Sequence, residues 1–384
     1  MLRKFELKNY KNFKDNIVID FGKVGGYQFG TDCITDNTIS KVLIYGRNST
    51  GKTNLGKALI NIGFTLYGYK IMSEGGIFLN ADSEEENALF VYTFKFGEDE
   101  VVYRYKRISE TELEEEELSI NGMEIFSCYY KDNFSMNCNN VYLGIENTTL
   151  DRFIQTIGSE DDNEEYSGQQ IPFLRWIIFN VAIKKGSLLL KLADYVKNMF
   201  MMTVSGGLGI RLRRAYDRFF ESLEDEEELK KFEEFLNFMG VECELVLKKL
   251  PDGQNELYFK HNKLIPFYEN ASSGTVALMN VYRRLIIAAK NTSLMYLDEF
   301  DAFYHYEMAE NLVKYFKQML PNCQIILTTH NTNLMTNRLM RPDCLFVLSR
   351  SGKLTALCDA TTRELREGHN LEKMYISGEF EAYE

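Results

Sequence analysis

The stretch "GRNSTGKT" constrains the fold of this chain more than any other feature of its sequence. It fits the pattern Gly-x-x-x-x-Gly-Lys-Thr, with Gly46, Gly51, Lys52 and Thr53 at the defining positions. The apolar run "KVLIY" precedes it, and apolar residues at helical spacing follow it. A buried strand, a glycine loop and a helix in this order predict an α/β domain whose loop binds phosphate.

The residue types in this loop suit a nucleotide and Mg²⁺. The glycines let the backbone curl so that its N–H groups, and the start of the helix, face the phosphates. Lys52 adds positive charge, and the hydroxyl of Thr53 can bind Mg²⁺. The expected nucleotide-binding residues are Gly46, Arg47, Asn48, Ser49, Thr50, Gly51, Lys52, Thr53 and Asn54.

A second motif, "SLMYLDEFD", is an apolar run that ends in Asp298 and Glu299. Asp298 at the end of a buried strand can hold Mg²⁺ together with Thr53. Glu299 can polarise the attacking water, because phosphoryl transfer needs mainly a placed nucleophile and neutralised charge. The pattern therefore predicts a metal site at Thr53 and Asp298 and a catalytic carboxylate at Glu299.

His330 follows another apolar run in "CQIILTTHN", about 31 residues beyond Glu299. In open α/β sheets, ligands bind at the carboxyl ends of the strands. We therefore expect His330 beside the same site, as a catalytic residue with Lys52 and Glu299.

A small polar turn opens the helix predicted in "NASSGTVALMNVYRRL". Two interpretations remain open at this point. Ser272 or Ser273 could cap the helix. Alternatively, the hydroxyls and Gly274 could form a second anion site, because the start of a helix receives phosphate well.

The rest of the chain indicates one α/β core with an insertion. Period-two alternation from about 88 to 126 predicts an antiparallel meander. The acidic runs that follow the loop helix, among them "ELEEEEL" and "EDDNEE", are interpreted as solvated helix faces or loops. The expected parts are 1–126 with the phosphate loop and the meander, 127–264 as a mainly helical insertion, and 265–384 with the remaining motifs.

The charge balance disfavours extended contact with nucleic acid. The chain has 44 Lys plus Arg against 56 Asp plus Glu, a formal net charge of −12. A protein that wraps DNA must neutralise many phosphates. A local basic stretch, "RLRRAYDRFF" with Arg211, Arg213, Arg214 and Arg218, could meet DNA, an acidic protein surface or only solvent.

The chain has no apolar run of the roughly 18 to 20 residues that a membrane span needs, and its start has no secretory signal. We therefore expect a cytoplasmic protein without a membrane partner. Its seven cysteines are widely spread, without a Cys-x-x-Cys pair, which favours reduced thiols and disfavours a zinc site.

Taken together, the four motifs resemble the ABC-type ATPase heads of the RecF, SMC and OLD-like class. The resemblance covers roughly residues 1–80 and 265–384 and includes the opening stretch "FELKNYKNFKD". It implies an α/β P-loop ABC-type ATPase head with an antiparallel β meander and a helical insertion. It also implies ATP and Mg²⁺ as cofactors and slow hydrolysis of ATP.

In that class "ASSGT" corresponds to the signature motif, so Ser272 and Gly274 would contact the γ-phosphate of a nucleotide held by a neighbouring protomer. His330 would be the switch histidine, and Asp301 would lie in the segment that crosses the dimer interface. The resemblance thus implies a homodimer or a higher homo-oligomer with composite sites. "ASSGT" lacks the leucine and the final glutamine or glutamate usual in the class, and the interlobe glutamine has three candidates, Gln155, Gln169 and Gln170.

The tail "LREGHNLEKMYISGEFEAYE" is similar to the end of stand-alone ATP-binding proteins from two-gene phage-defence and abortive-infection systems of the AbiL and PARIS type. This implies a regulatory or sensor ATPase that controls a separately encoded effector, a nuclease or toxin, in response to a phage-derived trigger. About 54 residues follow His330, too few for the TOPRIM nuclease domain of OLD-type proteins.

Two other functions remain open from the sequence. One is a RecF-like DNA-repair or DNA-maintenance ATPase that binds duplex DNA when ATP is bound. The other is a binding module in which ATP is a structural clamp and is hardly hydrolysed.

Overall fold

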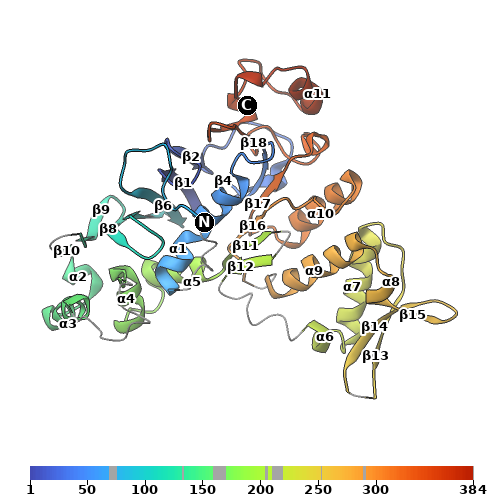
Figure 1. Cartoon of the computed structure of the whole chain (residues 1–384), viewed down its shortest axis with the longest axis horizontal. Coiled ribbons are helices and arrows are strands. Elements are labelled where there is room, and N and C mark those ends of the chain that lie inside the picture. The colour runs from blue at the N-terminus through green and yellow to red at the C-terminus, as the bar shows by residue number, and fades with distance from the viewer. Residues whose placement is uncertain are drawn as a thin grey trace.

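Two seven-stranded sheets form the body of the molecule, with helix α1 (Lys52–Tyr67) packed between them (Figure 1). The computed structural model describes residues 1–68, 76–131, 134–158, 170–203, 206–209, 219–251, 253–288 and 291–383. The other helices are α2 (Asn140–Leu143), α3 (Asn147–Gly158), α4 (Phe173–Asn180), α5 (Leu188–Lys197), α6 (Phe219–Ser222), α7 (Glu226–Phe238), α8 (Phe267–Asn270), α9 (Ser273–Ala288), α10 (Tyr306–Met319) and α11 (Leu371–Ile376). None of the helices in these ranges is long and apolar enough to cross a lipid bilayer.

The first sheet is parallel at its centre and carries the sequence motifs. Its order is β12 (Gly206–Gly209), β11 (Met199–Thr203), β16 (Leu294–Leu297), β17 (Gln324–Thr329), β5 (Lys41–Tyr45), β18 (Leu345–Leu348) and β19 (Leu354–Ala356). Strands β11, β16, β17, β5 and β18 pair in parallel, and the two edge strands are antiparallel. Every residue of β5, β16 and β17 is buried, which explains why these strands read as unbroken apolar runs.

The second sheet is antiparallel and contains the predicted meander. Its order is β10 (Ser135–Cys138), β9 (Met123–Tyr129), β8 (Leu113–Ile120), β7 (Asp99–Arg107), β6 (Ala88–Phe96), β1 (Leu2–Lys8) and β2 (Ile17–Asp20). The inward positions of β6 and β7 are mostly aromatic, and their rings form part of the core. The expected fold class is confirmed: an α/β P-loop head with an antiparallel meander and inserted helices.

One interpretation of the sequence is wrong. The acidic run "ELEEEEL" is neither a loop nor a helix face, because it forms most of strand β8. Glu116 in this strand is buried and accepts hydrogen bonds from the hydroxyls of Tyr103, at 2.7 Å, and Tyr130. The backbone N–H of Phe173, at the start of α4, donates to the same carboxylate. Burial raises the pKa of Glu116, and these donors act in the opposite direction.

Both sheets hold helix α1. From the antiparallel sheet, the hydroxyl of Tyr92 donates to the carbonyl of Ala58 at 2.6 Å. From the parallel sheet, the hydroxyl of Tyr296 donates to the carbonyl of Lys52 at 2.5 Å. A Cβ at Gly56 would lie 2.5 Å from the Tyr296 ring, so glycine is needed for this close approach. The helix that follows the phosphate loop is therefore fixed on two sides.

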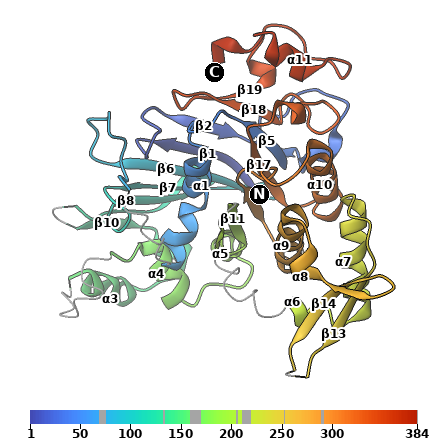
Figure 2. The same ribbon diagram turned by 45° about the vertical axis from the view of Figure 1, so that its right-hand side comes forward.

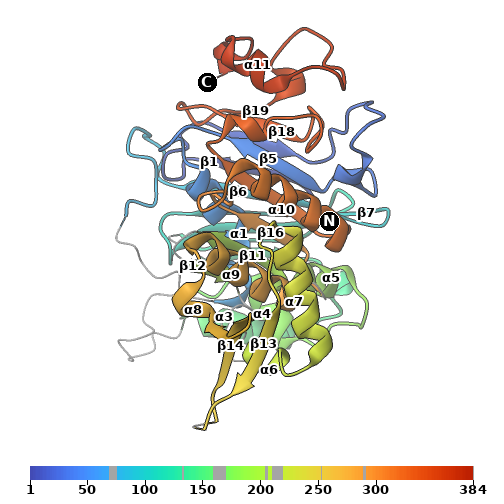
Figure 3. The same ribbon diagram turned by 90° about the vertical axis from the view of Figure 1, so that its right-hand side faces the viewer.

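The segment 127–264 contributes strands to both large sheets. It supplies β10 to the antiparallel sheet, and β11 and β12 to the parallel sheet. Helix α7 packs against α9, and a small sheet of β13 (Leu245–Lys249), β14 (Asn255–Lys260) and β15 (Leu264–Pro266) extends away from the large sheets (Figures 2 and 3). Two short strands, β3 (Ile34–Thr35) and β4 (Thr38–Ile39), precede β5 and pair with each other in antiparallel orientation. The expected division at 126/127 and 264/265 stays a prediction.

Some residues singled out in the sequence lie outside the described residues. These are the acidic run "EDDNEE", one of the three glutamines, and the arginines of the basic stretch, namely Gln169, Arg211, Arg213, Arg214 and Arg218.

Candidate functional site

The phosphate loop begins where β5 ends. The N–H of Gly46 donates to the carbonyl of Thr329 in the neighbouring strand at 3.2 Å. Ser49 and Gly51 have φ angles of 66° and 101°, in the left-handed region. A Cβ at Gly46 would lie 2.6 Å from the hydroxyl oxygen of Thr50, so the loop closes too tightly there for any other residue. The conformation explains both glycines of the motif.

The loop is a cradle of unpaired N–H groups. Within the described part of the chain, no acceptor is found for the backbone N–H groups of Asn48, Ser49, Gly51, Lys52, Thr53 and Asn54. The first N–H groups of a helix cannot bond within the helix, and its dipole favours an anion at this end. The donors of this loop therefore fit the phosphate chain of a nucleotide.

Lys52 folds back into the loop. Its Nζ donates to the carbonyls of Gly46, at 2.7 Å, and Arg47, at 3.1 Å. It also lies 3.8 Å from the carboxylate of Glu299. Burial lowers the pKa of Lys52, and the negative charge of Glu299 acts in the opposite direction. The lysine thus brings its charge to the place where the loop and the end of β16 meet.

Thr53 and Asp298 meet as the sequence predicts. The hydroxyl of Thr53 donates to Asp298 Oδ2 at 2.6 Å, and the hydroxyl of Thr328 donates to Asp298 Oδ1 at 2.8 Å. Burial raises the pKa of Asp298, and these two hydrogen bonds act against it. One hydroxyl and one carboxylate would suit Mg²⁺ in a nucleotide site, because this ion is usually bound there by one or two protein carboxylates together with oxygens of the phosphates.

Elsewhere, no group of three or more His, Cys, Asp or Glu side chains is placed to hold a metal ion within the ranges described above. The seven cysteines are free thiols.

Glu299 has an unusual backbone conformation. Its φ of 47° lies in the left-handed region, which is uncommon for any residue other than glycine. Its N–H donates to the hydroxyl of Thr328 at 2.8 Å, and its side chain is 37% exposed. One threonine therefore positions both acidic residues, Asp298 through its carboxylate and Glu299 through its backbone. The Glu299 carboxylate is left at the surface, where water can reach it.

Thr328 and Thr329 were missed by the sequence reasoning, although "LTTHN" carries two hydroxyls at the end of an apolar strand. The hydroxyl of Thr329 donates to Asp301 Oδ2 at 2.8 Å. Asp301 Oδ1 is buried and has no partner in the described residues. Burial raises the pKa of Asp301, whereas the Thr329 hydrogen bond and the charge of His330 act in the opposite direction. His330 itself is exposed and begins the loop after β17.

The start of α9 differs from the start of α1, because a side chain caps it. The hydroxyl oxygen of Ser272 accepts from the N–H of Thr275 at 3.1 Å, so Ser272 caps the helix. A Cβ at Gly274 would lie 3.1 Å from the carbonyl of Phe303, in the loop after Glu299. In the described chain, neither Ser272 nor Gly274 has a hydrogen bond to residues 46–54. Helices α1 and α9 lie on opposite sides of β11 and β16 (Figures 1 and 2).

The described glutamine candidates lie elsewhere. Gln170 Oε1 accepts from the N–H of Leu113 in β8 at 3.0 Å. Gln155 is exposed on α3. Neither has a hydrogen bond to the phosphate loop in the residues that the structure describes.

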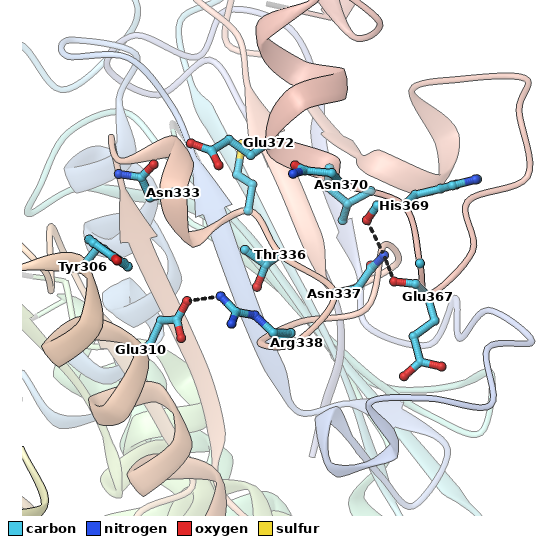
Figure 4. Close-up of a pocket in the computed structure, with 13 residues that line it drawn as sticks. Tyr306, Glu310, Asn333, Thr336, Asn337, Arg338, Glu367, His369, Asn370 and Glu372 are labelled. Atoms are coloured by element: carbon cyan, nitrogen blue, oxygen red, sulfur yellow. Dashed lines mark hydrogen bonds and ion pairs between the residues drawn. The ribbon is translucent and has the colours of Figure 1, made fainter.

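A polar cavity of about 530 Å³ lies between the start of α10, the loop after His330 and the C-terminal segment (Figure 4). Arg338 and Glu310 form an ion pair on its wall at 2.9 Å. Asn337 Nδ2 donates to the carbonyls of Arg366, Glu367 and His369 in the C-terminal segment, at 2.9, 3.1 and 3.2 Å. This amide therefore ties the C-terminal segment to the loop that His330 begins.

Comparison with known proteins finds a family model that matches part of the chain. Residues 209–336 match a family model described as "AAA domain, putative AbiEii toxin, Type IV TA system". The matched range is one third of the chain, and it contains the α9, β16 and β17 motifs but not the phosphate loop. No curated protein matches the chain. The family match and the geometry at the strand ends together support a P-loop ATPase domain.

Several solved structures are similar in fold. An Smc head bound to the C-winged helix domain of ScpA has a TM-score of 0.49 and 18% identity, covering 93% of this chain and 97% of that one. The SMC head domain from Thermotoga maritima has a TM-score of 0.43 and 16% identity, covering 92% and 98%. An Smc head from Pyrococcus furiosus, with an extended coiled coil and bound to the C-terminal domain of ScpA, has a TM-score of 0.48 and 15% identity, covering 93% and 96%.

Proposed function

We propose that this protein binds ATP with Mg²⁺ and hydrolyses the γ-phosphate bond. One observation carries the proposal: Lys52 and Thr53 of the phosphate loop meet Asp298 and Glu299, which follow β16 at the carboxyl end of the parallel strands. The loop N–H groups and Lys52 bind the phosphates, while Thr53 and Asp298 hold the metal. When bound, Mg²⁺ neutralises charge on the phosphates. Glu299 orients and polarises the attacking water.

Steady-state ATP turnover and ATP affinity, measured on three proteins, test this assignment. Glu299→Gln keeps the shape of the side chain but removes its charge, so we expect normal ATP binding and turnover lower by about two orders of magnitude or more. Lys52→Ala should lose both binding and turnover. Wild-type turnover in Glu299→Gln would refute the role of Glu299. No turnover by the wild type, with ATP bound, would instead favour a structural clamp.

We further propose that two protomers share each nucleotide, with Ser272 and Gly274 of one protomer facing the γ-phosphate held by the other. The support is that the exposed start of α9 is joined to its own neighbours and not to its own phosphate loop. Two exposed aromatic side chains, Phe303 and Tyr306, lie in the segment that contacts Gly274 and leads into α10. These two rings are available to pack against a second protomer at this place.

The solution mass of Glu299→Gln, measured by light scattering with and without Mg·ATP, tests this arrangement. A mass that doubles with nucleotide supports the shared site and makes ATP a clamp between protomers. A fixed oligomer in both conditions would mean that assembly is constitutive and that ATP gates a bound effector instead. A monomer in both conditions would contradict the shared site.

For the biological role, we propose a regulatory ATPase of an anti-phage, abortive-infection system that controls a separately encoded nuclease or toxin. The support is the family description, which names a putative toxin of a type IV toxin–antitoxin system, together with the resemblance of the tail. The net charge of −12 favours a protein partner over DNA.

Phage plating on bacteria that carry this gene and its neighbour, with wild-type or Lys52→Ala protein, tests the role. Protection that needs Lys52 supports it. Protection that is absent, combined with ATP-dependent and salt-sensitive binding of duplex DNA, would favour a RecF-like function.

A further inference from the structure

An asparagine from the N-terminal turn reaches into the phosphate loop. Asn12 lies between β1 and β2, 38 residues before Thr50, and its Nδ2 donates to the carbonyl of Thr50 at 3.0 Å. Its Oδ1 accepts from Nδ2 of Asn54, in the first turn of α1, at 2.7 Å. Because the carbonyl of Thr50 can only accept, the Asn12 Nδ2 must face the loop, which leaves its Oδ1 to accept from Asn54. Asn54, Asn12 and Thr50 are thus linked by two hydrogen bonds that connect the helix, the turn and the middle of the loop.

The bond to Thr50 fixes the orientation of one peptide group. A trans peptide is planar, and its C=O and N–H point in opposite directions. Because Asn12 holds the carbonyl of Thr50, the N–H of Gly51 in the same peptide is turned away from Asn12. That N–H has no acceptor in the described part of the chain and belongs to the cradle.

Gly51 makes this peptide easy to misplace. Its φ of 101° is accessible to glycine, which can also adopt many other conformations. A Cβ at this position would overlap the Asn12 amide, so the turn and the loop are in direct contact. An external bond is therefore needed to keep a flexible peptide in one orientation.

The turn that carries Asn12 is itself fixed. The N–H of Tyr10 donates to the carbonyl of Phe13 at 2.9 Å, the reverse bond is 2.8 Å, and both rings are buried. The side chain of Asn9 donates to the carbonyl of Glu85 at 2.7 Å. Asn12 thus extends from a support that does not depend on the phosphate loop.

We infer that Asn12 is a positioning residue for nucleotide binding, which holds the Thr50–Gly51 peptide so that the Gly51 N–H faces the phosphates. The inference rests on the proposed function, because it assumes that the loop binds a nucleotide. Asn12 contacts the loop and not the reacting atoms. It therefore sets the affinity for both Mg·ATP and Mg·ADP, and it leaves the rate of hydrolysis of bound ATP nearly unchanged.

The test measures Kd for Mg·ATP and Mg·ADP by calorimetry, kcat, and unfolding temperature for the wild type, Asn12→Ala and a control. The control is Asn80→Ala, because Asn80 Nδ2 donates to the carbonyl of Lys11 in the same turn, at 2.7 Å, without touching the loop. For Asn12→Ala we expect both Kd values to rise about tenfold, as for one lost hydrogen bond, with kcat within about twofold. Asn80→Ala should lower the unfolding temperature but change Kd less than about twofold.

If Asn80→Ala folds poorly, two other variants, Asn54→Ala and the double variant with Asn12→Ala, still test the inference. Asn54→Ala frees the Asn12 amide to rotate, so we expect Kd to rise about threefold. The double variant Asn12→Ala with Asn54→Ala should be no weaker than Asn12→Ala alone, because both act through one contact. If the two substitutions weakened nucleotide affinity additively, Asn12 and Asn54 would not act through one contact, and the inference would be contradicted.

The outcomes separate this inference from the proposed function. If the wild type binds Mg·ATP and Asn12→Ala binds it within about twofold, the inference is wrong and the proposed function stands. If Asn80→Ala weakens binding as much as Asn12→Ala does, the turn is only a general support and the inference is again wrong. If the wild type does not bind Mg·ATP, the proposed function fails and the inference fails with it.

Discussion

The two polar regions expected to meet at a nucleotide, the end of the phosphate loop with Asp298 and the start of α9, are built in opposite ways. At the first, hydrogen bonds join segments hundreds of residues apart, such as Thr53 to Asp298. At the second, the hydrogen bonds of Ser272 within the described residues go to Thr275 and Val276, in the same turn of the helix. The first region is organised by the fold of one chain, whereas the second is organised locally and leaves its surface open.

This difference explains what each region can do alone. The long-range bonds place a cation, a hydroxyl–carboxylate pair and a second carboxylate around one point, which is where we propose that the phosphates and the metal bind. In the described residues, the hydrogen bonds of Ser272 stay within the first turn of α9 and do not reach the phosphate loop. If a second copy of the chain completes the site as proposed, changes in the two regions should have separable effects.

The largest effect is expected from Lys52→Ala, which removes the cation of the first region. We expect the affinity for Mg·ATP to fall by about 100-fold or more, because a charge-assisted contact to phosphate is lost. Calorimetry with the wild type as reference measures the change. If affinity is retained within about threefold, the phosphates do not bind in this loop. The first region would then not be the nucleotide site.

A charge placed at the second region should act only on assembly. Ser272→Asp keeps a capping side chain but puts a negative charge beside the partner's phosphate, and like charges about 4 Å apart repel by about 4 kcal/mol at an effective dielectric constant of about 20. In the Glu299→Gln background, we expect ATP-dependent association to weaken by about 30-fold or more. The affinity of the monomer for ATP should not change.

Ser272→Asn is the matched control, because asparagine also caps helices but is neutral. Light scattering over a series of protein concentrations gives the association constants. Equal association of the two variants would mean that the start of α9 does not face a phosphate.

Thr328→Val tests whether one hydroxyl positions both acidic residues of the first region. Valine has nearly the same shape but cannot donate to Asp298 or accept from the N–H of Glu299. We expect turnover to fall about tenfold and the unfolding temperature to fall, since leaving buried polar groups unpaired costs about 1 to 3 kcal/mol each. Thr329→Val, which affects Asp301 instead, should lower stability with less than about a threefold change in turnover. Similar turnover in the two variants would contradict the special role of Thr328.

The smallest effect concerns pH. Burial raises the pKa of Asp298, so this carboxylate takes up a proton at a higher pH than an ordinary aspartate, whose pKa is about 3.9. A protonated carboxyl is a poor metal ligand, so we expect the Mg²⁺-dependent part of ATP affinity to decline as pH falls, beginning above the usual aspartate range. Titrations of ATP affinity from neutral pH downward should show a loss for the wild type that is absent in Asp298→Asn. Parallel pH profiles for the two proteins would show that Asp298 does not carry the metal.

The sequence was sufficient for the features whose signal is local. The runs "KVLIY", "LMYL" and "QIILTT" are apolar because they are buried on both faces of a parallel sheet, so the strands and the residues at their ends could be predicted. The glycine pattern of the loop is also local, since it reflects the φ angle of Gly51 and the close approach of Thr50 to Gly46. A helix cap at Ser272 or Ser273 could likewise be predicted from a short polar turn, and Ser272 provides it.

The features that were missed depend on partners distant in the chain. Nothing near Asn12 shows that its amide will meet Thr50, and nothing near Thr328 shows that it will hold Asp298. The acidic strand β8 was misread because its inward glutamate, Glu116, is compensated by two tyrosines and by the start of α4. A run of four glutamates indicates a solvated surface unless those donors are known.

The pairing of β5 has a consequence for how the protein is made. Both neighbours of this strand, β17 and β18, come from the last quarter of the sequence; Lys41 pairs with Ile325, 284 positions later. At the usual rate of about 5 to 20 residues per second, a ribosome needs roughly 15 to 60 s to make the intervening chain. Until then the strand that carries the phosphate loop has no partner in its own sheet, and the residues after it cannot meet Asp298. We therefore expect competence for the proposed nucleotide binding to arise late in synthesis, so that a truncated product of translation does not compete with the finished protein for ATP.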